Sequence, residues 1–202
     1  MIISWLGEAG IRIQSKDTVV IIDPPAASTG FKPTRQAVQI IALTQADGRD
    51  AKSLTGEPFM IDSPGEYERQ NVFIYGLPIA ADPGRVHFRL ETEDLSLGHL
   101  GNLAVKLDNG QAGAFEEVDI LFVPVGGKSV LDAEEAAELV SQIEPRIVIP
   151  IQFKIPGHPS AYGSIEAFLK EMGAKSAATI DKLKIVKKDL PAEETKVIVL
   201  TV

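Results

Sequence analysis

The chain has 202 residues, of which 45% are hydrophobic, and its 20 Lys and Arg against 28 Asp and Glu give a formal net charge of −8 at pH 7. This length suits a single domain over residues 1–202, and the lack of cysteine excludes thiolate metal sites, disulfides and cysteine nucleophiles. The acidic balance argues against general nucleic-acid binding, because neutralising phosphates requires clustered Lys and Arg.

Short β-branched runs dominate the first half of the chain. The runs bounded by Gly, Pro, Asp or Ser predict strands at residues 2–6, 11–14, 18–22, 37–43, 58–61, 72–75 and 86–90. Their spacing indicates antiparallel meanders. Residues 103–107 are a further strand candidate, and the Asn109-Gly110 pair that follows is favoured at tight turns.

The pattern changes in the second half of the chain. Residues 118–125 and 147–151 are nearly continuous apolar runs, which is typical of strands covered on both faces. Between them, residues 133–143 predict a helix with an apolar stripe at helical spacing. Asp132 is its expected N-cap, and Glu135, three residues on, completes a capping box.

The last part of the chain predicts one more helix and two strands. The helix covers residues 164–172, with Ser164 as its cap and Gly173 as its stop. The strands at residues 183–186 and 196–202 are predicted to form a closing hairpin. Strands in both halves, with helices between the later ones, indicate a layered α/β domain.

The N-terminal segment MIISWLGEAG carries an acid where a signal peptide carries positive charge. No apolar run approaches the roughly 18 residues that a membrane helix needs. We therefore expect neither export nor membrane insertion, and a cytoplasmic location.

The histidines give little support to a zinc site. His87, His99 and His158 lie far apart and form no i, i+2 or i, i+4 pair. A catalytic zinc takes at least three protein ligands from His, Asp, Glu and Cys, so a histidine-rich centre is nearly excluded. We interpret each histidine as structural or solvated.

Two loops resemble known sites in part. The Gly126-Gly127-Lys128-Ser129 loop lies between a predicted strand and helix, but the first glycine of a phosphate loop would fall at Phe122, inside the strand. It is therefore interpreted as an ordinary turn. In the loop at residues 44–50, carboxylates and an amide could ligate a hard cation, whereas Arg49 would repel one and pair with the acids. The self-neutralised loop is the favoured interpretation of the two.

Six segments of the chain stand out, in this order: WLGEAGIRIQ, VVIIDP, DSPGEYERQNVFIYGLP, HLGN, VDILFVPVGG and DAEEAAELVSQIEPRIVIPIQF. Together they resemble, in the same order, segments of the metallo-β-lactamase superfamily, and within it small metal-dependent hydrolases of similar length. The resemblance implies an α/β fold of the four-layer αββα sandwich type. It also implies a functional cleft at one edge of the two sheets.

The family holds zinc or another transition metal through His-x-His-x-Asp-His, a further histidine, a bridging aspartate and a last histidine. The cleft positions that the resemblance implies here are Glu8, Asp23, Gln45, Asp47, Arg49, Asp50, Ala81, Asn102 and Gln152. The first motif falls on Gln45, Asp47, Arg49 and Asp50, and the last histidine becomes Gln152. Alanine has no donor atom, amides carry no charge and arginine brings a cation, so each replacement weakens the binding of zinc.

From these replacements we expect no metal, no cofactor and no catalytic residue. The leading hypothesis is a metal-free pseudoenzyme that acts in binding or assembly, with a polar network centred on Arg49 in place of the metal. Its ligand or protein partner is not identified by the sequence, nucleic acid and membranes are not expected partners, and a homo-oligomer is left open. The alternative is a hydrolase of esters or phosphodiesters that holds Mg²⁺, Mn²⁺ or Ca²⁺ through oxygen ligands.

Overall fold

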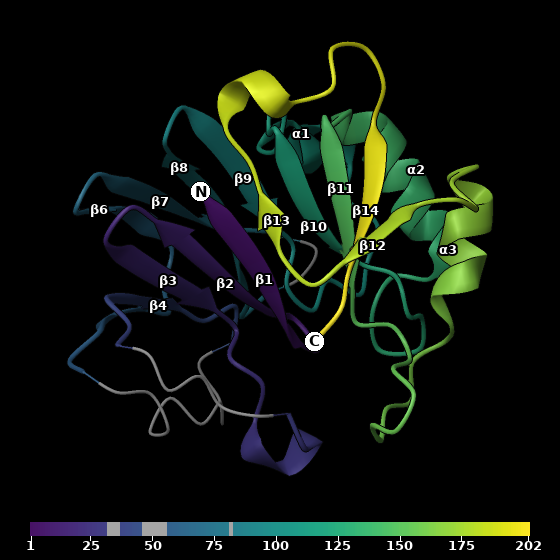
Figure 1. Cartoon of the computed structure of the whole chain (residues 1–202), viewed down its shortest axis with the longest axis horizontal. Coiled ribbons are helices and arrows are strands. Elements are labelled where there is room, and N and C mark those ends of the chain that lie inside the picture. The colour runs from purple at the N-terminus through teal and green to yellow at the C-terminus, as the bar shows by residue number, and fades with distance from the viewer. Residues whose placement is uncertain (32–36, 46–55, 81–82) are drawn as a thin grey trace.

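The computed structural model describes residues 1–31, 37–45, 56–80 and 83–202 (Figure 1). Two β-sheets pack against each other and share one hydrophobic core, to which Ile13 and Val20 contribute from one sheet and Phe88 and Leu97 from the other. The helices lie beside the second sheet (Figure 1). The sequence-based expectation of an α/β sandwich is confirmed.

The first sheet has six strands in the order β13-β1-β2-β3-β4-β5. Its strands are β1 (Ile2–Gly7), β2 (Gly10–Ser15), β3 (Thr18–Ile22), β4 (Ile40–Ala42), β5 (Phe59–Ile61) and β13 (Leu183–Lys184). The first three form an antiparallel meander, as the spacing predicts, and β4 and β5 then add in parallel. As a result, β1, β3 and β4 all end at the same edge of this sheet.

The second sheet has eight strands in the order β12-β14-β11-β10-β9-β8-β7-β6. Its strands are β6 (Gly65–Arg69), β7 (Val72–Pro78), β8 (Val86–Thr92), β9 (Leu95–His99), β10 (Ile120–Pro124), β11 (Ile147–Ile151), β12 (Ala178–Ile180) and β14 (Lys196–Leu200). The strands β6 to β9 are antiparallel, whereas β9, β10, β11, β14 and β12 are parallel. The residues of β10 and β11 are all buried, in agreement with their continuous apolar runs.

The helix α2 (Ala133–Ile143) forms as predicted. Asp132 accepts a hydrogen bond from the backbone of Glu135 at 2.9 Å, and the Glu135 side chain accepts one from the backbone of Asp132 at 3.1 Å, which completes the capping box. Its buried stripe includes Leu139, which is 5% exposed. The shorter helices α1 (Asn109–Gly113) and α3 (Ile165–Glu171) contact α2, and two 3₁₀ turns lie at Ala27–Thr29 and Lys187–Asp189.

Three local expectations are wrong. The strands β13 and β14 do not form a hairpin, because β13 pairs with β1 in the first sheet and β14 pairs with β11 and β12 in the second. Residues 103–107 form no strand. The Asn109-Gly110 pair begins α1 instead of a hairpin turn, because Asp108 caps this helix in a capping box with Gln111.

Other elements differ from expectation in detail. The strands β6, β9 and β12 were not predicted, and the strand expected at residues 37–43 is confined to β4. Ser164 occupies the N-cap position of α3 without a side-chain cap hydrogen bond. Gly173 ends this helix with a left-handed φ of 64°. Among the described residues, no helix is long and apolar enough to cross a membrane.

Candidate functional site

The carboxyl ends of strands from both sheets meet at one edge of the sandwich. The backbone N–H of Gln152, which follows β11, donates to the carbonyl of Glu8, which follows β1, at 3.2 Å. His99, the last residue of β9, makes a hydrogen bond from Nε2 to the carbonyl of Ala9 at 2.9 Å. These bonds join the two sheets at the place where the predicted cleft residues leave their strands.

Three amide side chains form a hydrogen-bonded row at this edge. Asn102 Nδ2 donates to Gln45 Oε1 at 3.3 Å, and Gln152 Nε2 donates to Asn102 Oδ1. Gln152 Nε2 also donates to the hydroxyl of Tyr162 at 3.2 Å. The structure thus brings together Gln45, Asn102 and Gln152, which lie up to 107 residues apart in the sequence as 152 − 45 = 107.

The amide oxygen of Gln152 is the least satisfied atom of this row. Gln152 is 1% exposed, and its Oε1 is buried with no hydrogen-bond partner among the described residues. Leaving a buried acceptor unpaired costs about 1–3 kcal/mol, so such an atom in a folded protein calls for a donor or a cation. This atom is therefore the strongest indication of a ligand at the edge.

Asp23 lies beneath the row and is fully buried. One of its carboxylate oxygens accepts from the backbone N–H of Thr44 at 2.8 Å, and the other accepts from the Thr44 hydroxyl at 2.6 Å. The carboxylate therefore fixes Thr44, the second residue after β4, and with it the adjacent Gln45. Charge-assisted hydrogen bonds of this kind are short and strong.

Tyr162 is the residue at this edge that the sequence analysis missed. Burial raises the pKa of its phenol, and the Glu8 carboxylate raises it further through its charge and a hydrogen bond. The phenol donates to Glu8, because a carboxylate can only accept, and Ser129 also forms a hydrogen bond with this phenol. Its sequence signal is weak, because Tyr162 lies ten residues beyond Gln152 in a segment without regular structure.

Three of the predicted cleft residues have a left-handed backbone. The φ angles are 51° at Glu8, 48° at Asp23 and 53° at Gln152, and each residue directly follows the last residue of a strand. Residues other than glycine adopt this conformation at a cost, and such strain gathers at functional sites. Left-handed residues also occur elsewhere, for example at Glu117 and Glu144, so this conformation describes the edge and does not by itself locate a site.

The histidines make structural contacts. The backbone N–H of Gly101 donates to His99 Nδ1 at 3.1 Å, so the ring is neutral and its Nε2 carries the proton given to Ala9. Nδ1 of the buried His87 lies 2.8 Å from the carbonyl of Leu100. His158 stacks on Phe31 with ring centroids 4.1 Å apart.

Several predicted positions lie outside the described residues, namely Asp47, Arg49, Asp50 and Ala81. The expected polar network around Arg49 therefore stays a prediction. In the part of the chain that the structure describes, no group of three or more His, Cys, Asp or Glu side chains could hold a metal. The donors described at this edge are oxygen atoms, which suit Mg²⁺, Mn²⁺ or Ca²⁺ better than zinc.

The Gly126-Gly127-Lys128-Ser129 loop forms a turn beside the site. A Cβ on Gly126 would lie 2.1 Å from the carbonyl oxygen of Gln152 and 2.6 Å from Cβ of Tyr162. Glycine is therefore required for the close approach of the two chain segments. The loop thus brings the segments that carry Gln152 and Tyr162 together.

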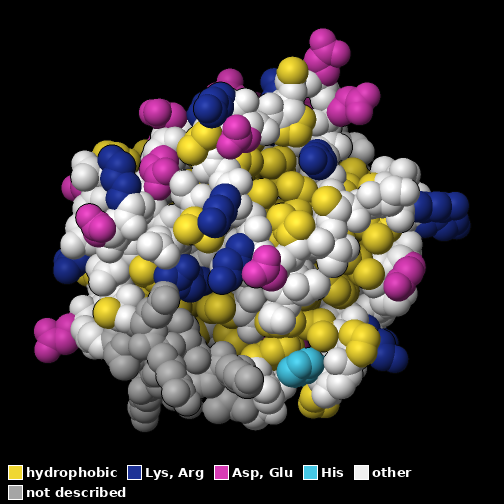
Figure 2. Space-filling model, viewed as in Figure 1, with side chains coloured by type: hydrophobic (Ala, Val, Ile, Leu, Met, Phe, Trp, Pro, Cys, Tyr) yellow, Lys and Arg dark blue, Asp and Glu magenta, His cyan; other side chains and the backbone are white. Residues whose placement is uncertain are grey.

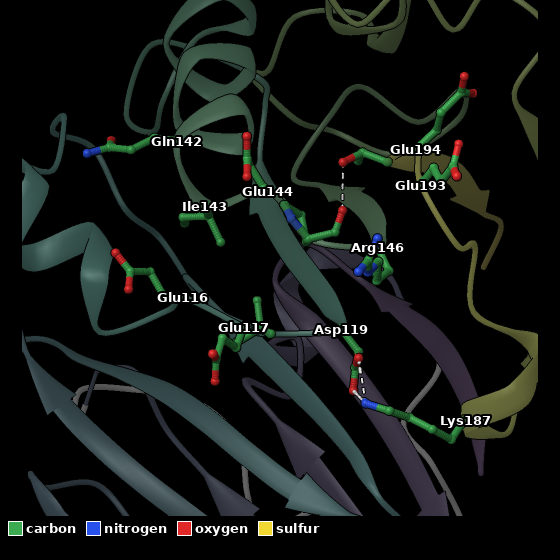
Figure 3. Close-up of a pocket in the computed structure, with 13 residues that line it drawn as sticks. Glu116, Glu117, Asp119, Gln142, Ile143, Glu144, Arg146, Lys187, Glu193 and Glu194 are labelled. Atoms are coloured by element: carbon green, nitrogen blue, oxygen red, sulfur yellow. Dashed lines mark hydrogen bonds and ion pairs between the residues drawn. The ribbon is translucent and has the colours of Figure 1, made fainter.

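A polar groove of about 680 Å³ lies at the opposite edge, where β10 and β11 begin (Figure 3). Its acidic side chains include Asp119, which is 7% exposed. This carboxylate accepts from Lys187 Nζ at 2.9 Å and from the backbone N–H of Ser96 at 2.9 Å. Protein groups thus satisfy this buried charge, whereas the hydroxyl of the neighbouring Ser96 is buried without a partner among the described residues.

Comparisons with known proteins identify the family. The family described as the beta-lactamase superfamily domain matches residues 2–152. A UPF0173 metal-dependent hydrolase of Lysinibacillus sphaericus is 25% identical over 193 residues, which cover 76% of this chain and 85% of the relative. A second UPF0173 metal-dependent hydrolase, from Cupriavidus taiwanensis, is 32% identical over 97 residues, or 47% of this chain and 33% of the relative.

A solved structure is similar over the full length of both chains. The Thermotoga maritima protein, described as a zinc-dependent hydrolase of the metallo-β-lactamase superfamily, superposes with a TM-score of 0.84 at 25% identity. Coverage is 100% of each chain.

These relatives contradict the expectation of a metal-free pseudoenzyme and the expectation of no cofactor, because they are named as metal-dependent hydrolases. The physical reason for the error is that the sequence argument counted lost nitrogen ligands. Oxygen donors that remain at the edge can serve a harder cation.

Proposed function

The chain belongs to the beta-lactamase superfamily domain family, and from this premise we propose that it is a metal-dependent hydrolase whose cation is held by oxygen ligands. The observation that carries the proposal is the buried and unpartnered Oε1 of Gln152 among the described residues, at the edge where both sheets end. A cation there would satisfy this atom without any rearrangement of the row of amides.

The residues of the edge fit a hard cation. Neutral amide oxygens are present on Gln152, Asn102 and Gln45. A carboxylate lies at the same edge, because Glu8 forms a hydrogen bond with Tyr162. Asp47 and Asp50 follow Gln45 in the sequence and lie outside the described residues. Carbonyl, amide and carboxylate oxygens are the ligands that Mg²⁺, Mn²⁺ and Ca²⁺ prefer.

The substrates proposed are esters or phosphodiesters. When bound, the cation would supply positive charge to the oxygen that gains negative charge during hydrolysis. The chain's own part is to hold the ligand oxygens still. Asp23 fixes Thr44 and so the start of the loop that carries Gln45, and the bond between Gln152 N–H and the Glu8 carbonyl ties the two sheets together.

The test is a titration of chelator-treated protein with Mn²⁺ and, separately, with Zn²⁺, followed by a hydrolysis screen with p-nitrophenyl esters and bis-p-nitrophenyl phosphate. We expect one Mn²⁺ per chain at about micromolar affinity, which corresponds to roughly −8 kcal/mol, and hydrolysis that depends on it. Gln152→Ala should weaken Mn²⁺ binding about 10–100-fold, whereas Gln142→Ala, on the exposed side of α2, should leave it unchanged. No stoichiometric binding by the wild-type protein would refute the proposal.

The remaining expectations about location and partners are proposals as well. A cytoplasmic location is supported by the lack of cysteine. On the face shown in Figure 2, basic side chains lie among acidic ones, which together with the net charge of −8 supports the absence of a nucleic-acid partner. Light scattering on the purified chain would decide whether it forms a homo-oligomer.

A further inference from the structure

We propose that Tyr162 is a positioning residue that sets which way round the Gln152 amide lies, so that the amide oxygen is left for the cation. The inference rests on the proposed function, because it gives a role to a neighbour of the same site. It goes further in naming a residue that controls the orientation of a ligand and does not itself bind the metal.

The direction of the hydrogen bonds follows from the chemistry of the phenol. A phenol has one proton to donate, and the Glu8 carboxylate, which has none, can only accept it. The Tyr162 oxygen is then left as an acceptor, and it accepts from the nitrogen of Gln152 at 3.2 Å and from Ser129. If the amide turned over, its oxygen would face a phenol oxygen with no proton to give.

The same direction passes along the row of amides. With its nitrogen turned toward Tyr162, Gln152 also donates to Asn102 Oδ1, and this orients the Asn102 nitrogen toward Gln45 Oε1. Both N–H groups of Gln152 are thus used. Its oxygen is the atom that remains, buried and without a partner among the described residues.

The backbone holds Tyr162 firmly in this position. The N–H of Gly163, the next residue, donates to the carbonyl of Gly126 at 2.7 Å, and the carbonyl of Gly163 accepts from Lys154 N–H at 2.9 Å. A Cβ at Gly126 would lie 2.6 Å from the Tyr162 Cβ, so the two segments are in direct contact. A side chain fixed in this way can impose its hydrogen-bond direction on a ligand.

The first experiment compares Tyr162→Phe with the wild-type protein in a calorimetric titration with Mn²⁺ alone. The variant keeps the ring and loses the hydroxyl, and we expect Mn²⁺ affinity to fall about 10–100-fold, as for other groups that orient a metal ligand. The matched control is Tyr67→Phe, whose lost hydroxyl bonds Ser63 at 3.0 Å on an exposed strand. The control should keep the wild-type affinity.

The second experiment uses metal-free protein and follows the side-chain NH₂ signals of Gln152 by ¹⁵N NMR. In the wild-type protein both protons should exchange slowly with solvent. In Tyr162→Phe one of them loses its acceptor, and its exchange should become about tenfold faster, while the denaturation midpoint stays close to that of Tyr67→Phe.

The outcomes separate the two proposals. Unchanged exchange in Tyr162→Phe, or unchanged affinity where the wild-type protein binds Mn²⁺, would overturn the role of Tyr162. If the wild-type protein binds no metal but the exchange of Gln152 responds to Tyr162, the proposed function fails and the positioning role stands.

Discussion

The strands β10 and β11 have a starting end, where both begin, and a finishing end, where both stop. The two ends differ in how the hydrogen-bonding groups of their side chains are satisfied. At the starting end, the Asp119 carboxylate accepts from Lys187 and from the backbone of Ser96. At the finishing end, the Gln152 amide donates twice and its oxygen accepts nothing among the described residues.

This difference teaches that charge and volume alone do not locate a site. The groove at the starting end has the acidic side chains and about 680 Å³ of space, yet its buried carboxylate is paired (Figure 3). The finishing end has neutral amides, and it holds the buried Gln152 Oε1, which accepts no hydrogen bond among the described residues. A buried polar atom without a hydrogen-bond partner is a better indication of a binding site than charge or volume.

The largest effect expected concerns the scaffold that both ends share. Leu139, 5% exposed, lies on the buried stripe of α2, so Leu139→Ala should lower the free energy of unfolding by about 2–5 kcal/mol. Urea denaturation measures this, with the exposed Glu134→Ala as the unchanged control. An unchanged midpoint for Leu139→Ala would show that the wrong face of α2 has been assigned to the core.

Gly126→Ala should damage the finishing end. Because the new Cβ would lie 2.1 Å from the Gln152 carbonyl oxygen, the segment that carries Gln152 and Tyr162 must move. We expect a loss of about 1–3 kcal/mol in unfolding free energy and Mn²⁺ binding weakened at least about tenfold. Gly113→Ala, whose Cβ meets its nearest atom at 3.6 Å, should change neither measurement.

Asp119→Ala should destabilise the starting end of β10 and β11 and leave the finishing end unchanged. Removing the carboxylate leaves the Ser96 N–H without its acceptor, which costs about 1–3 kcal/mol of unfolding free energy. Lys187→Ala should cost less than about 1 kcal/mol, because that side chain is 56% exposed. The Mn²⁺ affinity of both variants should equal that of the wild-type protein. A fall in affinity would mean that the groove takes part in metal binding.

The smallest effect belongs to a surface ion pair on α2. Glu138 accepts from Lys106 at 2.6 Å, and this hydrogen bond raises the pKa of Lys106. Its stabilisation is therefore present at neutral pH and is lost as the pH rises through that raised pKa. Glu138→Ala should barely shift the urea midpoint at pH 7, because both side chains are more than half exposed. In 1 M NaCl the small shift should disappear, since salt screens exposed charges. A large shift at pH 7 would show that the pair matters structurally.

The sequence predicted the unit of β10, α2 and β11 to within two residues at each boundary. Its strands are buried on both faces and its helix carries its own cap, so local patterns contain the needed information. The error at β13 and β14 has the opposite cause. Strand periodicity shows that a strand exists, but it does not show which sheet the strand joins, and here the two strands join different sheets.

The candidate site was predictable where it could be carried over from a family pattern. Gln45, Asn102 and Gln152 were named from the sequence, and the structure brings them together. Tyr162 was not named, because its role depends on the contact of its segment with Gly126. The expectation of no metal was wrong, because the residue types were compared with zinc ligands and the remaining oxygen donors were given too little weight.

The left-handed backbone at Glu8, Asp23 and Gln152 affects how replacements at these positions would change the stability of the protein. Glycine would relieve the backbone at each of these places, at the loss of the side chain that the edge uses. Asp23 would also lose its two short hydrogen bonds to Thr44, so screens for heat resistance alone should enrich replacements at Glu8 and Gln152 but not at Asp23. At Glu8 and Gln152, the residues that favour metal binding would therefore lower the thermal stability of the protein.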